Sequence, residues 1–253
     1  MNSVYFVGAG PGDPELITLK AKRLIEEADV IVYSGSLLNP KILEYAKKAV
    51  LYDASKMDRE EINNILAETA MDNKLAIRLH DGDPSIYSAI REQIDKLEYK
   101  GIKCYTIPGI SALFGAAARL NLELTLPEVT QTIIITRAEA RTPVPERERI
   151  VELAKHGSTM VFYLSVHLID KVVNELLEGG YSKDTPVAVV HKATWNDELI
   201  IISTLDKITS KVKDARINKT AIIIVGEVVS PKNYQFSKVY DPNFTHGYRR
   251  AKK

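Results

Sequence analysis

The fold of this chain is decided at one stretch of the sequence, Arg78-Leu79-His80-Asp81-Gly82-Asp83-Pro84-Ser85-Ile86-Tyr87-Ser88-Ala89. The apolar segment at 74–77 leads into this stretch and predicts a buried strand. Apolar residues at 86, 90 and 94 predict a helix after it, with Asp83 as the cap and Pro84 in the first turn. Because Gly82 permits a sharp turn, we expect a strand-to-helix junction of an open α/β sheet, where ligands bind.

The composition is that of an ordinary soluble globular protein. The chain has 253 residues, of which 45% are hydrophobic and 26% charged, enough for one large domain or two of about 120 residues. The formal net charge is +1, so no nucleic-acid partner is expected. Cys104 is the single cysteine, which excludes a disulfide framework. No apolar run approaches 18 residues and no leader pattern is present, so we expect a cytoplasmic protein without a membrane partner.

The order of expected elements predicts two α/β domains. Strand and helix patterns alternate through the first half, which indicates a mostly parallel sheet with helices on its faces. In the second half strand follows strand, which indicates a mixed sheet. We expect domains at 1–122 and 131–253, joined by a linker at about 123–130 around Pro127. Strands are expected at 4–7, 30–33, 50–52, 74–79, 102–107, 132–136, 159–164, 187–190, 199–203 and 221–225.

A second glycine-rich turn, Gly8-Ala9-Gly10-Pro11-Gly12-Asp13, follows the first expected strand. Its spacing does not fit dinucleotide binding, because Asp13 stands where that fingerprint needs a third small residue. A carboxylate at this position would repel a pyrophosphate. A nicotinamide-dependent oxidoreductase is therefore disfavoured, and no Walker loop is present.

Other common catalytic patterns are absent from the sequence. The five histidines do not have the spacing of metal ligands, so no metal is expected. No nucleophile-elbow serine is present. Asp81 and Asp83 could form an acid–base pair, but two carboxylates beside a glycine more often cap amides or bind a ligand hydroxyl.

Three motifs, in the same order along the chain, resemble the tetrapyrrole (corrin/porphyrin) methylases: residues 8–18, 81–84 and 108–112. The resemblance covers about residues 3–229. It implies a two-domain α/β fold and S-adenosyl-L-methionine as cofactor. Residues 33–40, 136–146 and 191–195 are more specific and resemble the branch that methylates (cobalt-)precorrin-4 at C11 in cobalamin biosynthesis. Members of the family are generally homodimers, which implies a homodimer here.

The resemblance also implies a cofactor site in the cleft between the domains, with contacts made largely by backbone groups. Asp81 departs from the glycine that many relatives carry at this place. No general base is recognised, and the catalytic candidates are Asp81, Asp83 and Tyr87. The residues implied at the cofactor are Pro11, Gly82, Asp83, Ile86, Tyr87, Ser111, Ala112, Leu164, Ala193, Thr220 and Ala221.

The implied substrate is a small-molecule tetrapyrrole that carries many carboxylates, so a basic substrate site is expected. Methyl transfer to a ring carbon depends mainly on alignment, which fits the lack of a base. The candidates for binding carboxylates are Arg78, His80, Arg137, Arg141 and Lys192. Alternatives are another precorrin or uroporphyrinogen III methylase, a macromolecule methylase, which the basic tail at 249–253 mildly favours, and a non-catalytic tetrapyrrole carrier.

Overall fold

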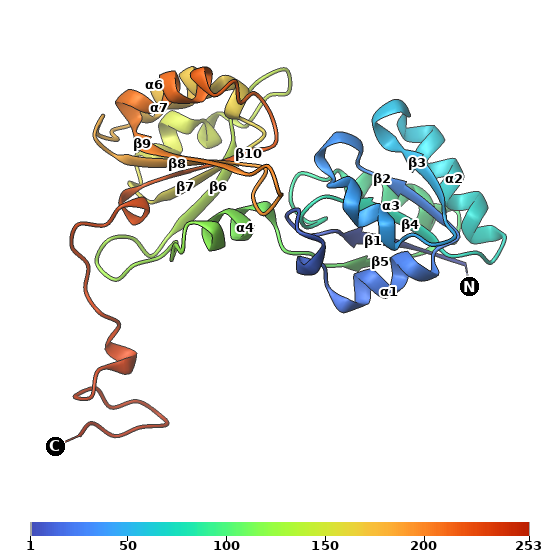
Figure 1. Ribbon diagram of the computed structural model, residues 1–253, viewed down its shortest axis with the longest axis horizontal. Helices are drawn as coiled ribbons and strands as arrows, with labels where there is room; N and C mark the ends of the chain where they lie inside the picture. The colour runs from blue at the N-terminus through green and yellow to red at the C-terminus, as the bar shows by residue number, and fades with distance from the viewer. Residues whose placement is uncertain (1, 253) are drawn as a thin grey trace. The chain divides into compact units, whose positions relative to one another are not determined.

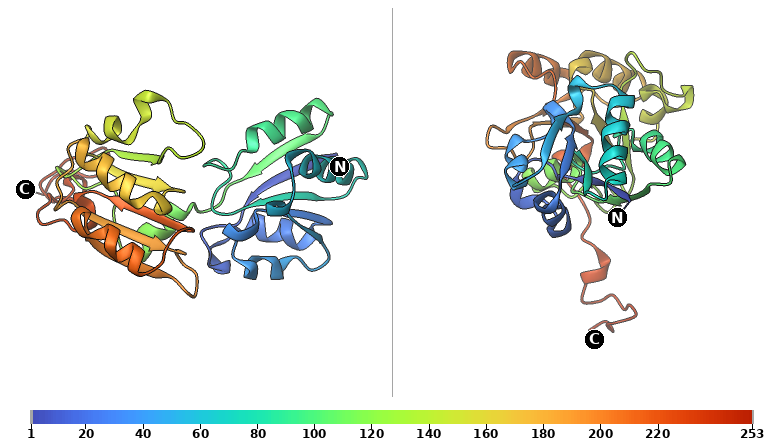
Figure 2. Two further views of the ribbon diagram at one scale, coloured as in Figure 1. Left: turned by 90° about the horizontal axis from the view of Figure 1, so that it is seen from above. Right: turned by 90° about the vertical axis from the view of Figure 1, so that its right-hand side faces the viewer.

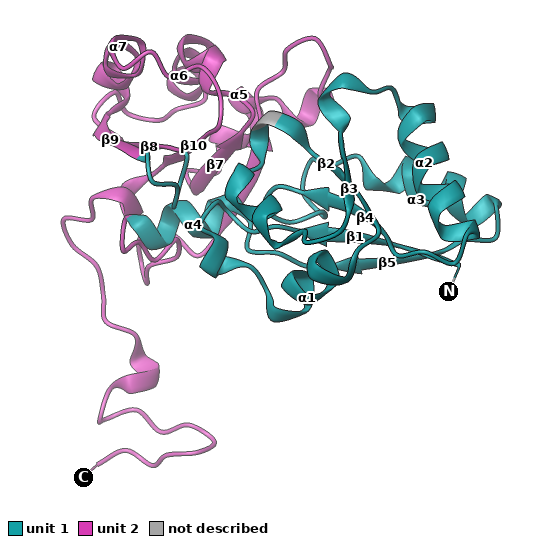
Figure 3. Cartoon of the chain, turned by 45° about the vertical axis from the view of Figure 1, so that its right-hand side comes forward, with its two compact units in different colours: residues 1–119, 192–198 teal, residues 120–191, 199–253 magenta. Residues whose placement is uncertain are grey.

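The computed structural model describes residues 2–252, and its contacts divide the chain into two compact units. The first unit holds residues 1–119 together with 192–198, and the second holds 120–191 and 199–253. Figure 3 colours the two units and shows segment 192–198 with the first. The domain limits expected from the sequence remain a prediction. Lys253, the last residue of the basic tail, lies outside the described residues.

The sheet of the first unit has five parallel strands in the order β3-β2-β4-β1-β5 (Figure 1). The carboxyl ends of its three neighbouring strands β4, β1 and β5 come together, because Gly8 pairs with His80 and Val7 with Ile107. Loops that follow these strands therefore lie at one edge of the sheet. The strands are β1 (Ser3–Gly8), β2 (Val30–Tyr33), β3 (Val50–Asp53), β4 (Ala76–His80) and β5 (Lys103–Ile107).

Helices cover both faces of this sheet (Figure 1). Helix α1 packs on the face that carries Val7 and Ile31, and α2 and α3 pack on the face that carries Phe6. The hydroxyl of Thr18 accepts a hydrogen bond from Ala21 N, as expected for the cap of α1. The helices are α1 (Leu19–Glu27), α2 (Arg59–Met71), α3 (Ile90–Tyr99) and α4 (Ala112–Arg119), with 3-10 turns at Pro14–Leu16, Gly35–Leu37, Pro40–Tyr45 and Ala54–Lys56.

The second unit contains a mixed five-stranded sheet in the order β6-β7-β10-β8-β9. β6 and β7 are parallel and the other neighbours antiparallel. Helices α5, α6 and α7 lie on one face of this sheet, over a core that includes Phe162 and Ile223 (Figures 1 and 2). The elements are β6 (Ile133–Arg137), α5 (Ile150–Ala154), β7 (Thr159–Tyr163), α6 (Ile169–Glu178), β8 (Pro186–His191), β9 (Leu199–Thr204), α7 (Leu205–Asp214) and β10 (Ala221–Val225).

The fold class expected from the sequence is confirmed, with one parallel and one mixed sheet. Every expected strand is present within two residues at either end. The predicted start of one helix is wrong, because α3 begins at Ile90 and not at Pro84. Tyr87 and Ala89 adopt left-handed backbone conformations, with φ of 54° and 50°, which delay the helix. Among residues 2–252, no helix has the length and apolar character needed to cross a membrane.

Candidate functional site

Three glycines bring the turns after β1, β4 and β5 into backbone contact in the first unit. A Cβ added to Gly109 would lie 2.2 Å from the carbonyl oxygen of Gly82. A Cβ added to Gly8 would lie 2.7 Å from both that oxygen and the amide nitrogen of Gly109. Real side-chain atoms do not approach so closely, so only glycine permits this packing. Each of the three turns therefore contacts the other two.

Hydrogen bonds join the first turn to the central turn. Gly10 N donates to Gly82 O at 3.2 Å and Gly82 N to Gly10 O at 2.9 Å, while Ala9 N donates to His80 O at 2.8 Å. Gly10 and Gly82 both have positive φ, of 80° and 59°. The two turns therefore extend the pairing of β1 and β4 beyond the strands and present backbone groups at the carboxyl edge of the sheet.

The carboxylate of Asp83 fixes the central turn to the third. One oxygen accepts from Gly109 N at 2.9 Å, and the other accepts from Ser85 N at 2.8 Å and from the Ser85 hydroxyl. Burial acts to raise the pKa of Asp83, but the hydrogen bonds from Ser85 and Gly109 outweigh it and lower the pKa. Asp83 caps amides, the interpretation that the sequence favoured over an acid–base role.

Arg78 and His80 point from β4 into the face covered by α2 and α3, and both are buried, with exposed fractions of 7% and 2%. The Arg78 guanidinium donates to Val32 O at 3.1 Å, to Leu79 O at 3.2 Å and to Gln93 Oε1 at 3.3 Å. Burial lowers the pKa of Arg78 to about 10, so it remains charged at neutral pH. This burial argues against direct substrate contact by either residue in the present conformation.

His80 and Asp81 are both held in an environment that disfavours charge. Burial, reinforced by the Arg78 charge, lowers the pKa of His80 to about 3. The imidazole is stacked on Phe6 at 6.1 Å between ring centroids, and its Nε2 is buried with no hydrogen-bond partner among residues 2–252. Burial raises the pKa of Asp81, although the nearby Arg78 partly offsets this. At neutral pH His80 is therefore uncharged.

Several residues predicted at the cofactor, and Lys192, predicted at the substrate, have a strained backbone. Tyr87, Leu164 and Thr220 have φ between 52° and 54°, and Lys192 has φ of 50°. A left-handed conformation is unfavourable for residues other than glycine, most of all for a β-branched one such as Thr220, and it often marks functional turns. Tyr87 and Leu164 are also about half exposed, unusual for large apolar side chains.

Segment 192–198, between β8 and β9 in sequence, packs on the first glycine turn within the first unit. The Trp195 indole Nε1 donates to Pro11 O at 3.2 Å. The carbonyl oxygen of Ala193 lies 3.0 Å from where a Cβ of Gly12 would be. Two predicted cofactor residues that are far apart in sequence, Pro11 and Ala193, are thus brought together by this packing.

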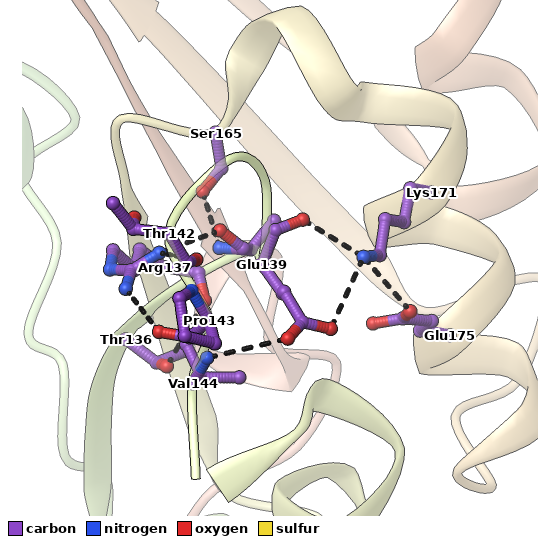
Figure 4. A network of polar contacts seen from close by, with 10 residues as sticks. Thr136, Arg137, Glu139, Thr142, Pro143, Val144, Ser165, Lys171 and Glu175 are labelled. Carbon is purple, nitrogen blue, oxygen red and sulfur yellow. Dashed lines mark hydrogen bonds and ion pairs between the residues drawn. The ribbon is translucent and has the colours of Figure 1, made fainter. Parts of the chain in front are cut away.

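In the second unit, Arg137 fixes the loop that follows β6 (Figure 4). Its guanidinium donates to Ala138 O at 3.4 Å, to Thr142 O at 3.2 Å and to Pro143 O at 2.8 Å. These acceptors are neutral carbonyl oxygens, so none of the three forms an ion pair with Arg137. Arg141 lies within the loop and is exposed. Arg137 therefore supports the loop that carries Arg141, the other residue predicted to bind anions there.

A lysine on α6 supports the same loop from outside it (Figure 4). Lys171 Nζ donates to Glu139 O at 2.8 Å and lies 4.0 Å from the Glu139 carboxylate and 3.7 Å from that of Glu175. Glu139 in turn accepts from Val144 N at 3.4 Å. The sequence analysis did not identify Lys171, because its contacts depend on how α6 packs.

The remaining predicted residues of the second unit gather at one end of its sheet. Arg137 pairs with Tyr163, and Ala221 pairs with His191. Leu164 follows β7 directly, and Thr220 precedes β10. Because β7 and β10 are antiparallel neighbours, the end of one strand meets the start of the other. Leu164, Thr220 and Ala221 therefore lie at the same sheet edge as Arg137.

This arrangement was compared with known proteins. The chain matches the Tetrapyrrole (Corrin/Porphyrin) Methylases over residues 3–209. It belongs to this family. The tetrapyrrole methylase is 59% identical over 251 residues to the cobalt-precorrin-4 C(11)-methyltransferase of Methanocaldococcus jannaschii, with 99% of this chain and 97% of the relative covered.

Two solved structures share the architecture of this tetrapyrrole methylase. One is the X-ray structure of a cobalamin biosynthetic enzyme, cobalt precorrin-4 methyltransferase, with a TM-score of 0.88, 41% identity and coverage of 90% of this chain and 96% of that one. The other is uroporphyrin-III C-methyl transferase from Thermus thermophilus complexed with S-adenyl homocysteine. Its TM-score is 0.76 and its identity 29%, with 90% of this chain and 98% of that one covered.

The described residues of this tetrapyrrole methylase contain no group of three or more histidine, cysteine or acidic side chains placed to hold a metal ion.

Ile110, next to Ser111 in the third turn, is 37% exposed and was not predicted as a site residue. The sequence showed an apolar residue between Gly109 and Ser111 in an expected turn, but its exposure is known only from the folded chain.

Proposed function

We propose that this chain transfers the methyl group of S-adenosyl-L-methionine to C11 of precorrin-4, or of its cobalt form, in cobalamin biosynthesis. The observation that carries the proposal is the backbone contact of three glycine turns at one edge of the sheet. The similarity of the chain to a cobalt-precorrin-4 C(11)-methyltransferase supports the same assignment. A methylase needs such turns because a compact nucleoside must be reached by backbone donors and acceptors.

The residues of the first unit fit this cofactor. A Cβ added to Gly82 would lie 3.5 Å from the amide nitrogen of Ala112 and 3.6 Å from Cα of Ser111, so the central turn also packs against the third turn. Tyr87 and Ile110 expose apolar surface beside the turns, at fractions of 46% and 37%. Apolar surface next to backbone polar groups suits an adenosine and a methionyl chain. The proposal assigns to this cofactor Pro11, Gly82, Asp83, Ile86, Tyr87, Ser111, Ala112 and Ala193, and Leu164, Thr220 and Ala221 of the second unit.

The cofactor would supply an electrophilic methyl group on its sulfonium, and the rest of the cofactor would leave as a neutral thioether, which needs no acid. The protein must then hold the nucleophilic ring carbon in line with that methyl group, since alignment contributes most of the rate. Asp83 contributes by fixing the turns through Gly109 and Ser85. Asp81, whose pKa is raised by burial, is the candidate for exchanging a proton with the substrate.

We expect the substrate carboxylates to bind to the side chains of Arg141, Lys192 and Arg137. Arg141 is exposed and lies in the loop that Arg137 braces. Replacing Arg141 by glutamine should raise KM for the tetrapyrrole several-fold and leave the affinity for S-adenosylhomocysteine unchanged. An unchanged KM would remove Arg141 from the substrate site.

Two measurements test the proposal as a whole. Calorimetric titration with S-adenosylhomocysteine should give saturable binding, and no detectable heat at millimolar ligand would contradict it. Turnover with a carbon-labelled methyl donor should then convert cobalt-precorrin-4 or precorrin-4 to a product labelled at C11, located by NMR. Uroporphyrinogen III serves as the competing substrate, and methylation of it alone would favour another branch of the family.

A homodimer in the cytoplasm is the assembly that we infer from the family resemblance. Light scattering of the purified chain tests the first part, because a dimer has twice the 28.2 kDa mass of one chain. Cell fractionation tests the second. Neither result changes the assignment of the methyl-transfer residues.

A further inference from the structure

The side chain of Trp195 occupies the place where any residue but glycine at position 12 would put its Cβ. That atom would lie 2.0 Å from the indole Cδ1 and 2.3 Å from Nε1. The same indole nitrogen donates to Pro11 O at 3.2 Å. The edge of the indole that carries Cδ1 and Nε1 therefore lies against the first glycine turn and is matched to it both in shape and in hydrogen bonding.

One further contact holds the same segment on the first turn, and the carboxylate of Glu198 joins the segment to helix α4. The backbone amide of Asp13 donates to the hydroxyl of Thr194 at 2.9 Å. The carboxylate of Glu198 accepts from Thr194 N at 2.7 Å and from Arg119 Nε at 2.8 Å and 3.1 Å. The Glu198 side chain is only 10% exposed, so this ion pair is largely shielded from solvent on the carboxylate side.

Helix α4 has a matching adaptation. A Cβ on Gly115 would lie 2.6 Å from the Cβ of Pro11 and 3.6 Å from the methyl group of Thr194. Glycine inside a helix costs about 0.5–1 kcal/mol relative to alanine, so its use there needs a reason. The reason here is the close approach of the first turn and of segment 192–198.

We propose that Trp195 and Glu198 are positioning residues that dock segment 192–198 on the first glycine turn and so set the cofactor affinity. The inference rests on the proposed function, because Pro11 and Ala193 are its assigned cofactor residues. The segment holds Lys192 and Thr194 in left-handed conformations, with φ of 50° and 69°, which persist only where contacts enforce them. When only a fraction of the molecules is docked, the apparent affinity falls by that fraction.

Substitutions at Trp195 test the docking. Trp195→Ala removes the ring and the hydrogen bond and should raise the Kd for S-adenosylhomocysteine about tenfold or more, with a smaller effect on kcat than on the KM for the methyl donor. Trp195→Phe keeps an aromatic ring but loses the hydrogen bond and part of the indole's packing, so the rise should be about two- to tenfold. Tyr99→Ala, at a fully exposed ring of the same unit, is the control. A Trp195→Ala protein that binds within twofold of the wild type overturns the inference.

A double-mutant cycle tests the contact itself, without cofactor. Gly12→Ala should lower the melting temperature of the wild-type chain because of its clash with the indole, and should lower it much less in the Trp195→Ala background. Additive shifts would overturn the docking. Trp195 is the only tryptophan, so its emission should also shift to the red in Gly12→Ala. A wild-type chain that fails to bind S-adenosylhomocysteine contradicts the proposed function, and the cycle then still decides the docking.

Discussion

The carboxylate of Asp83 accepts a hydrogen bond from the amide of Gly109 at 2.9 Å, across 26 positions of sequence. The same carboxylate accepts from Ser85 N, so it holds two successive turns of the first unit in one arrangement. These bonds explain why the carboxylate of Asp83, in a candidate cofactor turn, points toward backbone amides of the protein. Asp83 therefore prepares the site, whether or not it also contacts a ligand.

Asp83→Asn should lower the free energy of unfolding by about 1–3 kcal/mol, because an amide oxygen cannot replace both acceptor oxygens. It should also weaken binding of S-adenosylhomocysteine. Urea unfolding and calorimetry measure the two effects. Asp95→Asn, which breaks an exposed ion pair with Arg91, is the control and should change stability by less than about 0.5 kcal/mol. Equal effects of the two substitutions would contradict the bridging role.

Gly109→Ala should be strongly destabilising, by about 3 kcal/mol or more, because its Cβ would lie 2.2 Å from Gly82 O and backbone must move. Gly247→Ala is the matched control, since nothing lies within 4 Å of its added Cβ. Thermal unfolding of both variants measures the difference. A melting temperature of Gly109→Ala close to that of the control would mean that the turns do not meet as described.

His80 should make the protein less stable in mild acid. The pKa of His80 is about 3 in the folded state, below its ordinary value of 6.5, so the unfolded chain binds the extra proton between these pH values. Stability therefore rises with pH in this window, by up to about 1.4 kcal/mol per unit from this group, and is lost on acidification. His80→Gln should show a shallower slope between pH 4 and 6. Parallel profiles for variant and wild type would contradict the buried neutral state.

Lys171→Met should raise KM for the tetrapyrrole by about two- to fivefold, because the loop that carries Arg141 loses its brace through Glu139. Stability should change by less than about 1 kcal/mol, since Lys171 is partly exposed. Lys213→Met is the control. It removes an exposed ion pair between Lys213 on α7 and Asp170, which lies on α6 like Lys171, and it should leave KM unchanged. Steady-state kinetics at saturating methyl donor distinguish the two variants.

Local patterns were sufficient to predict the strands and most of the helices. Short apolar runs such as Val30–Tyr33 are bounded by polar turns, and their burial follows from the residues themselves. The start of α3 was mispredicted because Pro84 satisfies the local rules for a first helical turn. The left-handed backbone at Tyr87 and Ala89 is set by tertiary packing, which periodicity does not report.

The candidate site could be predicted only where its chemistry lies in contiguous motifs. The three glycine turns were found in this way, and Asp83 was correctly favoured as a cap for amides. Arg78 was expected to bind substrate carboxylates because it stands near a strand end. Its partners, Val32 O and Gln93, come from other elements, and no local rule predicts them. Trp195 was noted within a family motif, but its contact with Gly12 requires the folded chain.

The docking of Trp195 also sets an order of events during synthesis. The indole and its acceptor on Pro11 are 184 positions apart. The last strand of the first sheet ends at Ile107, so that sheet has all its strands well before Trp195 is translated. At about 5–20 residues per second, several seconds separate the two events. For that interval the first glycine turn of the nascent chain lacks the cover that the indole of Trp195 provides.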